Sequence, residues 1–320
     1  MALFFNNKLS RRCLSAGAQV DRYRVEKTLG GGGFSVVYLA LEQDTGRRVI
    51  VKEYMPPRLA RRRDDLTVVA SGADSEERFH HGRLLFFREA GILANLVHPN
   101  IVHVLNFFEA NGTVYLVMPF EQGRNLQSYI KSRGGRLSEE LLRAMLTPLL
   151  DALRLIHSRD VLHLDIKPGN VHLRPGGSPL LLDFGALHRR FEHGRAHGGQ
   201  VITAGFSPVE QYEPNGYVGP WTDIYALGAT LRTCIEGRTP PPAPQRYQKD
   251  TLRPAVTAFK KRYSQSLLRA IDWTLEVDPL LRPQRVDQVL AELAPAEATA
   301  PMPVCAAPGR CVDGAPAGKG

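Results

Sequence analysis

Short apolar runs separated by turn-forming residues characterise the first part of the chain. They cover residues 23–25, 36–39 and 49–51, and a further pair of runs spans residues 101–108 and 113–118. Runs rich in β-branched and aromatic residues, bounded by glycine and polar residues, are typical of antiparallel strands. The pattern therefore predicts a sheet near the start of the chain.

Helical spacing of apolar residues dominates the rest of the sequence. It predicts a helix over residues 79–96, a long helix over 138–157 and mostly helical structure over 221–293. Two more short strands are expected at residues 171–173 and 180–182. Strands followed by helices indicate an α+β fold, with a small β-rich lobe that carries one long helix and a larger α-rich lobe.

The predicted lobes cover residues 21–119 and 124–294. Residues 1–20 read as a flexible leader, and residues 295–320, which are rich in alanine, proline and glycine, read as a disordered tail. Residues 54–78 contain Pro-Pro and a run of arginines and break the strand rhythm. This insertion is either regulatory or a tolerated surface loop, and we favour the surface loop.

Composition excludes several classes of protein. The 320 residues are 43% hydrophobic and 23% charged, which rules out a wholly disordered or collagen-like chain. We expect no membrane segment, no signal peptide and a cytoplasmic location, because no apolar run approaches the roughly 18–20 residues that span a bilayer. The net charge is +9, but the densest basic run, 61–63, lacks aromatic neighbours and precedes two aspartates. We therefore expect no nucleic-acid partner.

Two features of the predicted sheet could bind an anion. The turn Gly30–Gly33 lies between two predicted strands, where backbone N–H groups can approach phosphate oxygens because no Cβ intervenes. A flexible hairpin turn explains the same glycines equally well. Lys52 ends the next strand and is either a solvated charge or a phosphate ligand held by a carboxylate such as Glu89.

The strongest chemical signal is a loop of charged and amide side chains. Asp165, Lys167 and Asn170 lie within six positions, and Asp183 follows the next predicted strand. Asp165 can orient a hydroxyl nucleophile and accept its proton, and Lys167 can neutralise charge on a transferred phosphoryl group. Asn170 and Asp183 offer the hard oxygen ligands that Mg²⁺ prefers.

With these motifs in place, the sequence resembles the eukaryotic-type serine/threonine protein kinase family, in its bacterial branch. The resemblance runs from about Tyr23 to Leu293 and includes the glycine-rich turn, the lysine strand and a His-Pro-Asn turn at residues 98–100. It implies the bilobal protein kinase fold, with ATP and Mg²⁺ as cofactors and protein hydroxyls as acceptors.

The resemblance also assigns roles to single residues. Catalysis is carried over to Asp165, Lys167, Asn170, Lys52 and Glu89, with Asn170 and Asp183 on the metal. The implied ATP-binding residues are Gly30, Gly31, Gly32, Gly33, Phe34, Ser35, Val37, Ile50, Lys52, Met118, Pro119, Glu121 and His172. Met118 is the implied gatekeeper, and the backbone at Pro119 and Glu121 is the implied adenine hinge.

Further family features lie beyond the nucleotide. The resemblance implies a buried Asp223 and an ion pair between Glu210 and Arg282. Thr203 matches the threonine that contacts Asp165 and Lys167 in kinases that act on serine and threonine.

Departures from the family pattern concern regulation and the nucleotide slot. Leu164 stands where most members carry an arginine that binds a loop phosphate, and no Ser, Thr or Tyr occurs between Gly185 and Ile202. We expect activity without phosphorylation of this loop. The same loop, between Gly185 and Ile202, carries basic residues that are either solvated or attract acidic substrates: His188, Arg189, Arg190, His193, Arg195 and His197.

Two further departures concern the nucleotide slot. Ile50 and His172 should make the adenine slot tighter and partly aromatic.

Two alternatives to a protein kinase stay open. A pseudokinase would bind nucleotide without transferring phosphate, but the charged residues expected for catalysis are all present. A small-molecule phosphotransferase shares a similar His-x-Asp core, yet Lys167 and the pair Glu210 and Arg282 argue against it.

Overall fold

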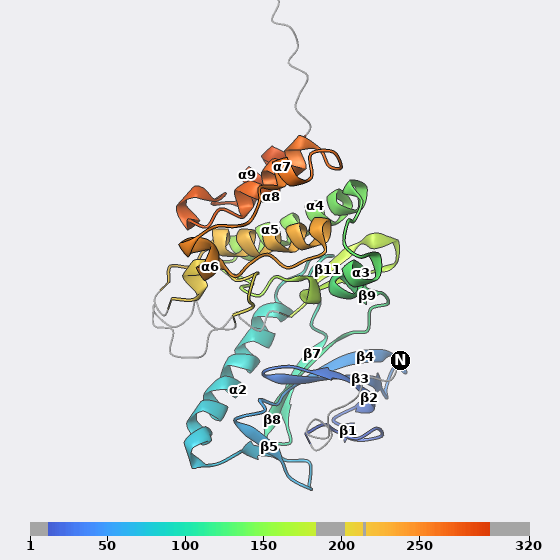
Figure 1. The fold of residues 1–320 in the computed structure, drawn as a ribbon. Helices are drawn as coiled ribbons and strands as arrows, with labels where there is room; N and C mark the ends of the chain where they lie inside the picture. The colour runs from blue at the N-terminus through green and yellow to red at the C-terminus, as the bar shows by residue number, and fades with distance from the viewer. Residues whose placement is uncertain (1–11, 184–201, 214–215, 295–320) are drawn as a thin grey trace, which may run out of the picture.

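Two lobes of different secondary structure make up the molecule, as Figure 1 shows. The computed structural model describes residues 12–183, 202–213 and 216–294. The smaller lobe is built on a six-stranded antiparallel sheet with the strand order β1-β2-β3-β4-β8-β7. Its strands are β1 (Gln19–Val20), β2 (Tyr23–Gly31), β3 (Ser35–Glu42), β4 (Arg48–Tyr54), β7 (Asn106–Ala110) and β8 (Thr113–Pro119).

Helix α2 (Ala73–Ala94) accompanies this sheet and is preceded by the hairpin of β5 (Ala60–Arg62) and β6 (Val68–Ala70). The predicted helix start at residue 79 was wrong. The first turn carries Asp74 and Glu76, which stabilise the positive end of a helix dipole but show no apolar periodicity. The predicted insertion is therefore a hairpin and a helix start, not an irregular loop.

Two other expectations near the sheet need correction. Residues 12–20 were expected to belong to a flexible leader, but Leu14 and Val20 are buried and β1 pairs with β2. The strand expected at 101–108 begins only at Asn106, because Val102 N–H donates to the carbonyl of Leu181 in the other lobe instead. Residues 1–11 and the predicted tail 295–320 lie outside the described residues.

The larger lobe is mainly helical. Its helices are α3 (Leu126–Arg133), α4 (Glu139–Ser158), α5 (Pro220–Glu236), α6 (Ala243–Gln248), α7 (Ala255–Ala258), α8 (Gln265–Thr274) and α9 (Val286–Leu293). A small sheet of β9 (Arg124–Asn125), β10 (Val171–Leu173) and β11 (Pro179–Leu181) lies next to α3. Short 3₁₀ turns complete the lobe: η1 (Pro168–Asn170), η2 (Pro175–Gly177), η4 (Val209–Gln211) and η5 (Pro279–Leu281). This architecture confirms the predicted α+β fold with two lobes.

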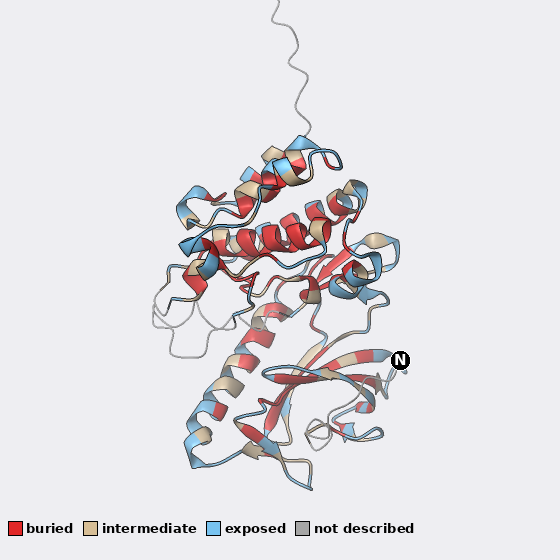
Figure 2. Ribbon diagram, in the orientation of Figure 1, coloured by how far each residue is buried: buried red, intermediate tan, exposed pale blue. Residues whose placement is uncertain are grey.

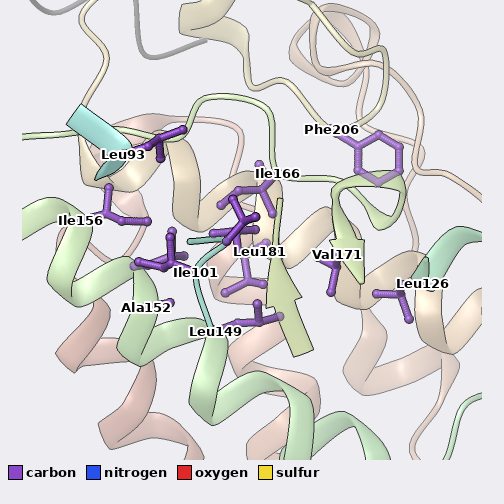
Figure 3. Close-up of a cluster of buried hydrophobic side chains, with 14 of the residues drawn as sticks. Leu93, Ile101, Leu126, Leu149, Ala152, Ile156, Ile166, Val171, Leu181 and Phe206 are labelled. Carbon is purple, nitrogen blue, oxygen red and sulfur yellow. The ribbon is translucent and has the colours of Figure 1, made fainter. Parts of the chain in front are cut away.

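The hydrophobic core continues from one lobe into the other. Figure 2 shows α5 buried along most of its length, and α4 buries one face beside it. Figure 3 shows Leu93, near the end of α2, beside Ile156 of α4, with Ile101 and Leu181 close by. The end of α2 is thus anchored on the large lobe, which limits how far the lobes can shift at this point. Within the described ranges, no helix is long and apolar enough to cross a membrane.

Candidate active site

Five segments far apart in the sequence supply the predicted catalytic, metal-binding and phosphate-binding residues. The glycine-rich turn, residues 30–35, joins β2 to β3, Lys52 lies on β4, and Glu89 lies on α2. The loop 163–170 runs between α4 and β10, and Asp183 follows β11. The fold therefore determines which of these residues meet.

Lys52 connects the two lobes through an ion pair. Its Nζ lies 2.5 Å from Oδ1 of Asp183, and the lysine side chain is only 10% exposed. Burial alone would lower the pKa of Lys52, but the charges of Asp183 and Glu89 outweigh burial and raise it. The positive charge of Lys52 in turn lowers the pKa of Asp183. Both side chains are therefore charged at neutral pH.

Glu89 lies buried on α2 and interacts electrostatically with this pair. Burial raises the pKa of Glu89 to about 7, although the charge of Lys52 opposes the shift. The ion pair that the structure records at Lys52 is the one with Asp183. In its ionised form, Glu89 raises the pKa of Lys52 electrostatically.

Three side chains hold the carboxylate of Asp165. Lys167 Nζ lies 2.9 and 2.7 Å from its two oxygens, and Thr203 Oγ1 donates to Oδ1 at 2.8 Å. Asn170 Nδ2 donates to Oδ2 at 3.0 Å and to the backbone carbonyl of Asp165 at 2.8 Å. These hydrogen bonds fix the orientation of the carboxylate. Thr203 reaches it from far along the chain.

Asp223, at the start of α5, fixes the loop that carries Asp165. Its buried carboxylate accepts from the backbone N–H groups of His163 and Leu164 at 2.9 and 2.7 Å. The His157 side chain donates to it at 2.9 Å. Leu164 has a φ of 62°, which is strained for a branched side chain. The two hydrogen bonds to Asp223 hold the backbone in this conformation.

His163 is a buried positioning group in the same loop. Its Nε2–H donates to the carbonyl of Leu182 at 3.0 Å, and Nδ1 accepts from the backbone N–H of Asp165 at 3.3 Å. Burial lowers the pKa of His163, so the ring is neutral at pH 7. The imidazole therefore links the segment before Asp183 to the Asp165 loop.

The implied ion pair between Glu210 and Arg282 is present in the structure. The two side chains make bonds of 2.7 and 3.1 Å and are almost fully buried. Thr222 Oγ1 donates to Glu210 as well, at 2.9 Å. A buried bidentate pair of this kind fixes the segment around η4 to the end of the large lobe.

The glycine-rich turn has room around its backbone. A Cβ built on Gly30, Gly32 or Gly33 would meet no atom within 4 Å, and none of these glycines has a positive φ. The fold itself therefore does not require glycine at these positions. Phe34 at the tip is 48% exposed, and Ser35 begins β3.

The expected adenine-contacting residues line one face of the sheet and the segment beyond it. Ile50 on β4 lies opposite Met118 on β8, and Val37 on β3 lies opposite Lys52. Side chains two residues apart share a face, so Ile50 lies on the same face as Lys52. Val37, Ile50 and Met118 are each partly exposed.

Two side chains of the large lobe secure the segment after β8. His172 Nε2–H donates to the carbonyl of Gln122 at 3.1 Å. Arg174 binds both carboxylate oxygens of Glu121 at 3.2 Å and the carbonyl of Pro99 at 2.7 Å. Arg174 was missed from the sequence, because nothing in the local pattern pairs β10 with the hinge. Side chains of the large lobe thus hold the segment after β8, which is the expected hinge, in place.

The surroundings of Leu164 are apolar. Leu162 and Leu164 form a small buried cluster with Val218 packed against it. Gln211 Nε2–H donates to the carbonyl of Leu164 at 3.0 Å. Because position 164 is a leucine, it offers no positive charge that could bind a phosphate group. The residues Phe184 and Gly185 and the basic loop residues 188–197 lie outside the described residues.

The donor set at Asn170 and Asp183 fits a magnesium ion that a nucleotide also coordinates. Because Nδ2 of Asn170 is held by Asp165, the amide oxygen is the atom that can face a cation. Asp183 is half exposed and ionised. Among the described residues no cluster of three or more His, Cys, Asp or Glu could hold a metal alone. Mg²⁺ usually completes such a site with phosphate oxygens and water.

Comparison with known proteins identifies the family. The family model for the protein kinase domain matches residues 23–293. Serine/threonine-protein kinase PknA of a Nostoc species is 33% identical over 231 residues, which cover 69% of this chain and 38% of that protein. Serine/threonine-protein kinase F of a Synechocystis species is 32% identical over 291 residues, or 85% of this chain and 54% of that protein. The chain thus spans about half or less of the length of these relatives.

A solved structure gives the same answer. The apo form of PpkA-294 superimposes with a TM-score of 0.79 and 35% sequence identity, covering 88% of this chain and 100% of that one. The resemblance noted in the sequence is therefore confirmed. Residues 23–293 are a protein kinase domain, and the chain belongs to the bacterial branch of the eukaryotic-type serine/threonine protein kinase family.

Proposed function

We propose that this protein transfers the γ-phosphoryl group of ATP to serine or threonine hydroxyls of protein substrates, with Mg²⁺ as the metal. The observation that supports this most strongly is the carboxylate of Asp165, held by Lys167, Asn170 and Thr203. Beside it, the Lys52–Asp183 pair presents opposite charges of the kind that bind phosphate and metal.

In the proposed reaction the acceptor oxygen attacks the γ-phosphorus while the bond to the β,γ-bridging oxygen breaks. Asp165 orients the hydroxyl and takes its proton, and ADP carries away the bond electrons. Lys167 lies against Asp165 and neutralises charge that develops on the transferred group. Thr203, bonded to both, aligns the acceptor. Positioning and electrostatics supply most of the rate.

The nucleotide would lie between the glycine-rich turn and the hinge. Open space around Gly30, Gly32 and Gly33 suits close approach of phosphates to the backbone. Lys52 would pair with the α- and β-phosphates, with Glu89 tuning its charge. Asn170 and Asp183 would hold Mg²⁺, which supplies charge neutralisation between the phosphates. Since ATP is needed, we place the activity in the cytoplasm.

We also infer that activity does not depend on phosphorylation of the segment before Thr203. Most members of the family carry an arginine at the position of Leu164, which binds a loop phosphate. Leu164 has no charge for a phosphate and packs against Leu162 instead. Gln211 and Asp223 fix the same loop without a phosphate.

A pseudokinase is the second candidate, because we expect Ile50 and His172 to narrow the adenine slot. The contact of His172 with the hinge carbonyl of Gln122 is the observation that favours it. The intact Asp165 network argues for transfer, so nucleotide binding without transfer would be the result that supports the pseudokinase. The Glu210–Arg282 pair argues against a small-molecule phosphotransferase.

Replacing Asp165 with asparagine separates chemistry from binding. The variant Asp165→Asn should lower kcat for a protein substrate by about 10²- to 10⁴-fold, because the general base is lost. Its dissociation constant for ATP should stay close to the parental value. Labelled γ-phosphate transfer and calorimetric ATP titration measure the two quantities, with the exposed Asp44→Asn as control. Parental turnover in Asp165→Asn would remove Asp165 from the mechanism.

Phosphatase treatment tests the role of the loop. We expect protein with no phosphate on residues 184–213, as verified by mass spectrometry, to transfer phosphate at the untreated rate. The physical reason is that position 164 carries no charge for a phosphate to pair with. Activity that appears only after a phosphate is added to this segment contradicts the inference.

The raised pKa of Glu89 gives stability a specific pH dependence. Between pH 4.5 and about 7 the native carboxyl is protonated and the unfolded one is ionised, so the folded state binds the extra proton. The unfolding free energy should therefore fall as pH rises through this window, by on the order of 3 kcal/mol. The variant Glu89→Gln should lack this component when urea denaturation is measured at each pH. Identical pH slopes for the two proteins would show that Glu89 is ionised in the native state.

A further inference from the structure

A fully buried carboxylate lies on the face of β4 opposite Lys52. Glu53 is 0% exposed, and it accepts hydrogen bonds from the hydroxyls of Tyr38 and Tyr115, each at 2.7 Å. Arg62 NH2 lies 2.5 Å from the same carboxylate. Because these tyrosines lie on β3 and β8, one carboxylate ties together three neighbouring strands.

Arg62 brings the β5–β6 hairpin and the first described residues to this carboxylate. Its Nε donates to the carbonyl of Arg12 at 3.0 Å, and NH1 donates to the carbonyl of Leu66 at 2.9 Å. Its side chain is only 4% exposed. Arg12 in turn binds the carbonyl of Met55, just after β4. The guanidinium thus connects three segments around Glu53.

The hairpin is also connected to its surroundings at other points. Val68 N–H donates to the carbonyl of Asn111 in the turn between β7 and β8, at 2.8 Å. Arg83 of α2 reaches the same turn through the carbonyl of Gly112 at 3.2 Å. Figure 1 shows β5 at the end of the small lobe remote from the helical lobe. These contacts do not fit the tolerated surface loop that we favoured from the sequence.

On the opposite face of the sheet, the end of β4 packs against α2. The ring of Tyr54 lies 5.7 Å from those of Phe79 and Phe86. Lys52 Nζ lies 5.6 Å from the centre of the Phe86 ring. Strand alternation places Lys52 and Tyr54 on the face of α2, and Glu53 on the face of the hairpin. The last residues of β4 are thus enclosed between the catalytic face and the Arg62 network.

We propose that Arg62 and Glu53 are positioning residues that set the place of Lys52, so that the β5–β6 hairpin belongs to the catalytic apparatus. This inference rests on the proposed kinase function of the same site. Glu53 is the direct chain neighbour of Lys52, and its three bonds fix the backbone from which the lysine side chain extends. A lysine that must meet phosphate oxygens is sensitive to shifts of about 1 Å.

A contribution to stability does not by itself explain why the buried ion pair of Arg62 and Glu53 is present. Removing two charges from water costs free energy, and apolar residues of similar volume often support a fold equally well. The surrounding core residues Val36, Val51 and Val117 already supply apolar packing. A fixed geometry next to Lys52 is what the ion pair adds, because its hydrogen bonds have direction and hydrophobic contacts do not.

The test compares three changes in the full chain. Arg62→Met with Glu53→Gln removes both charges together, and Arg62→Lys keeps a charge near Glu53 but cannot reach Arg12 and Leu66 at once. Arg61→Met is the matched control, since Arg61 is the exposed neighbour on β5 and makes no ion pair within the described part of the chain. Urea midpoint, ATP dissociation constant and kcat/KM for ATP are measured for each.

We expect the control to match the parent in all three quantities. The double variant should keep a near-parental urea midpoint while its kcat/KM for ATP falls about ten- to a hundredfold. Arg62→Lys should be folded and show a smaller fall in the same direction. Parental kcat/KM in a folded Arg62→Lys overturns the proposal even if the double variant fails to fold.

A cycle with Lys52 separates positioning from a purely structural role. If Arg62 acts through Lys52, then Arg62→Lys should weaken ATP binding in the parent but have no further effect in a Lys52→Met background. Equal losses in both backgrounds contradict the proposal. If the parent binds ATP but transfers no phosphate, the kinase function fails, and the binding cycle still decides the role of Arg62.

Discussion

The ion pair between Lys52 and Asp183 is the interaction on which the rest of the site depends. It joins β4 of the small lobe to the segment after β11 of the large lobe, over a distance of 2.5 Å. The charge of the lysine keeps the aspartate ionised, and the two carboxylates nearby keep the buried lysine charged. Each side chain thus keeps the other in its charged form. The charged lysine can bind phosphate oxygens, and the charged aspartate can bind a metal ion that is coordinated by the same polyphosphate.

A second constraint acts from inside the large lobe. Helix α5 is buried along most of its length, and its Asp223 accepts two backbone N–H groups of the loop that carries Asp165. This bonding holds Leu164 in a strained conformation and leaves the side chain of Leu164 in an apolar cluster. The proposed base therefore lies in a loop that is hydrogen-bonded to a buried helix.

The sequence predicted the two-lobed fold and the local motifs, because a short motif fixes charged residues relative to one another. Prediction from the sequence failed where the local structure depends on contacts between residues that are far apart in the chain. The start of α2 was hidden by a polar first turn, and the packed segment around Leu14 read as a loose leader. Residues 54–78 read as a surface loop, since the contact between Arg62 and Glu53 depends on a hairpin returning to the sheet. Arg174 gave no signal for the same reason.

The most direct test of the account is the effect of Mg²⁺ on ATP affinity, measured by calorimetry in the parent and in Asp183→Asn. If Asp183 and Asn170 hold the metal beside the Lys52 amine, Mg²⁺ should tighten ATP binding several-fold in the parent and have little effect in the variant. An equal tightening by Mg²⁺ in both proteins would show that the metal binds elsewhere, and the convergence of these side chains on one nucleotide would then be wrong.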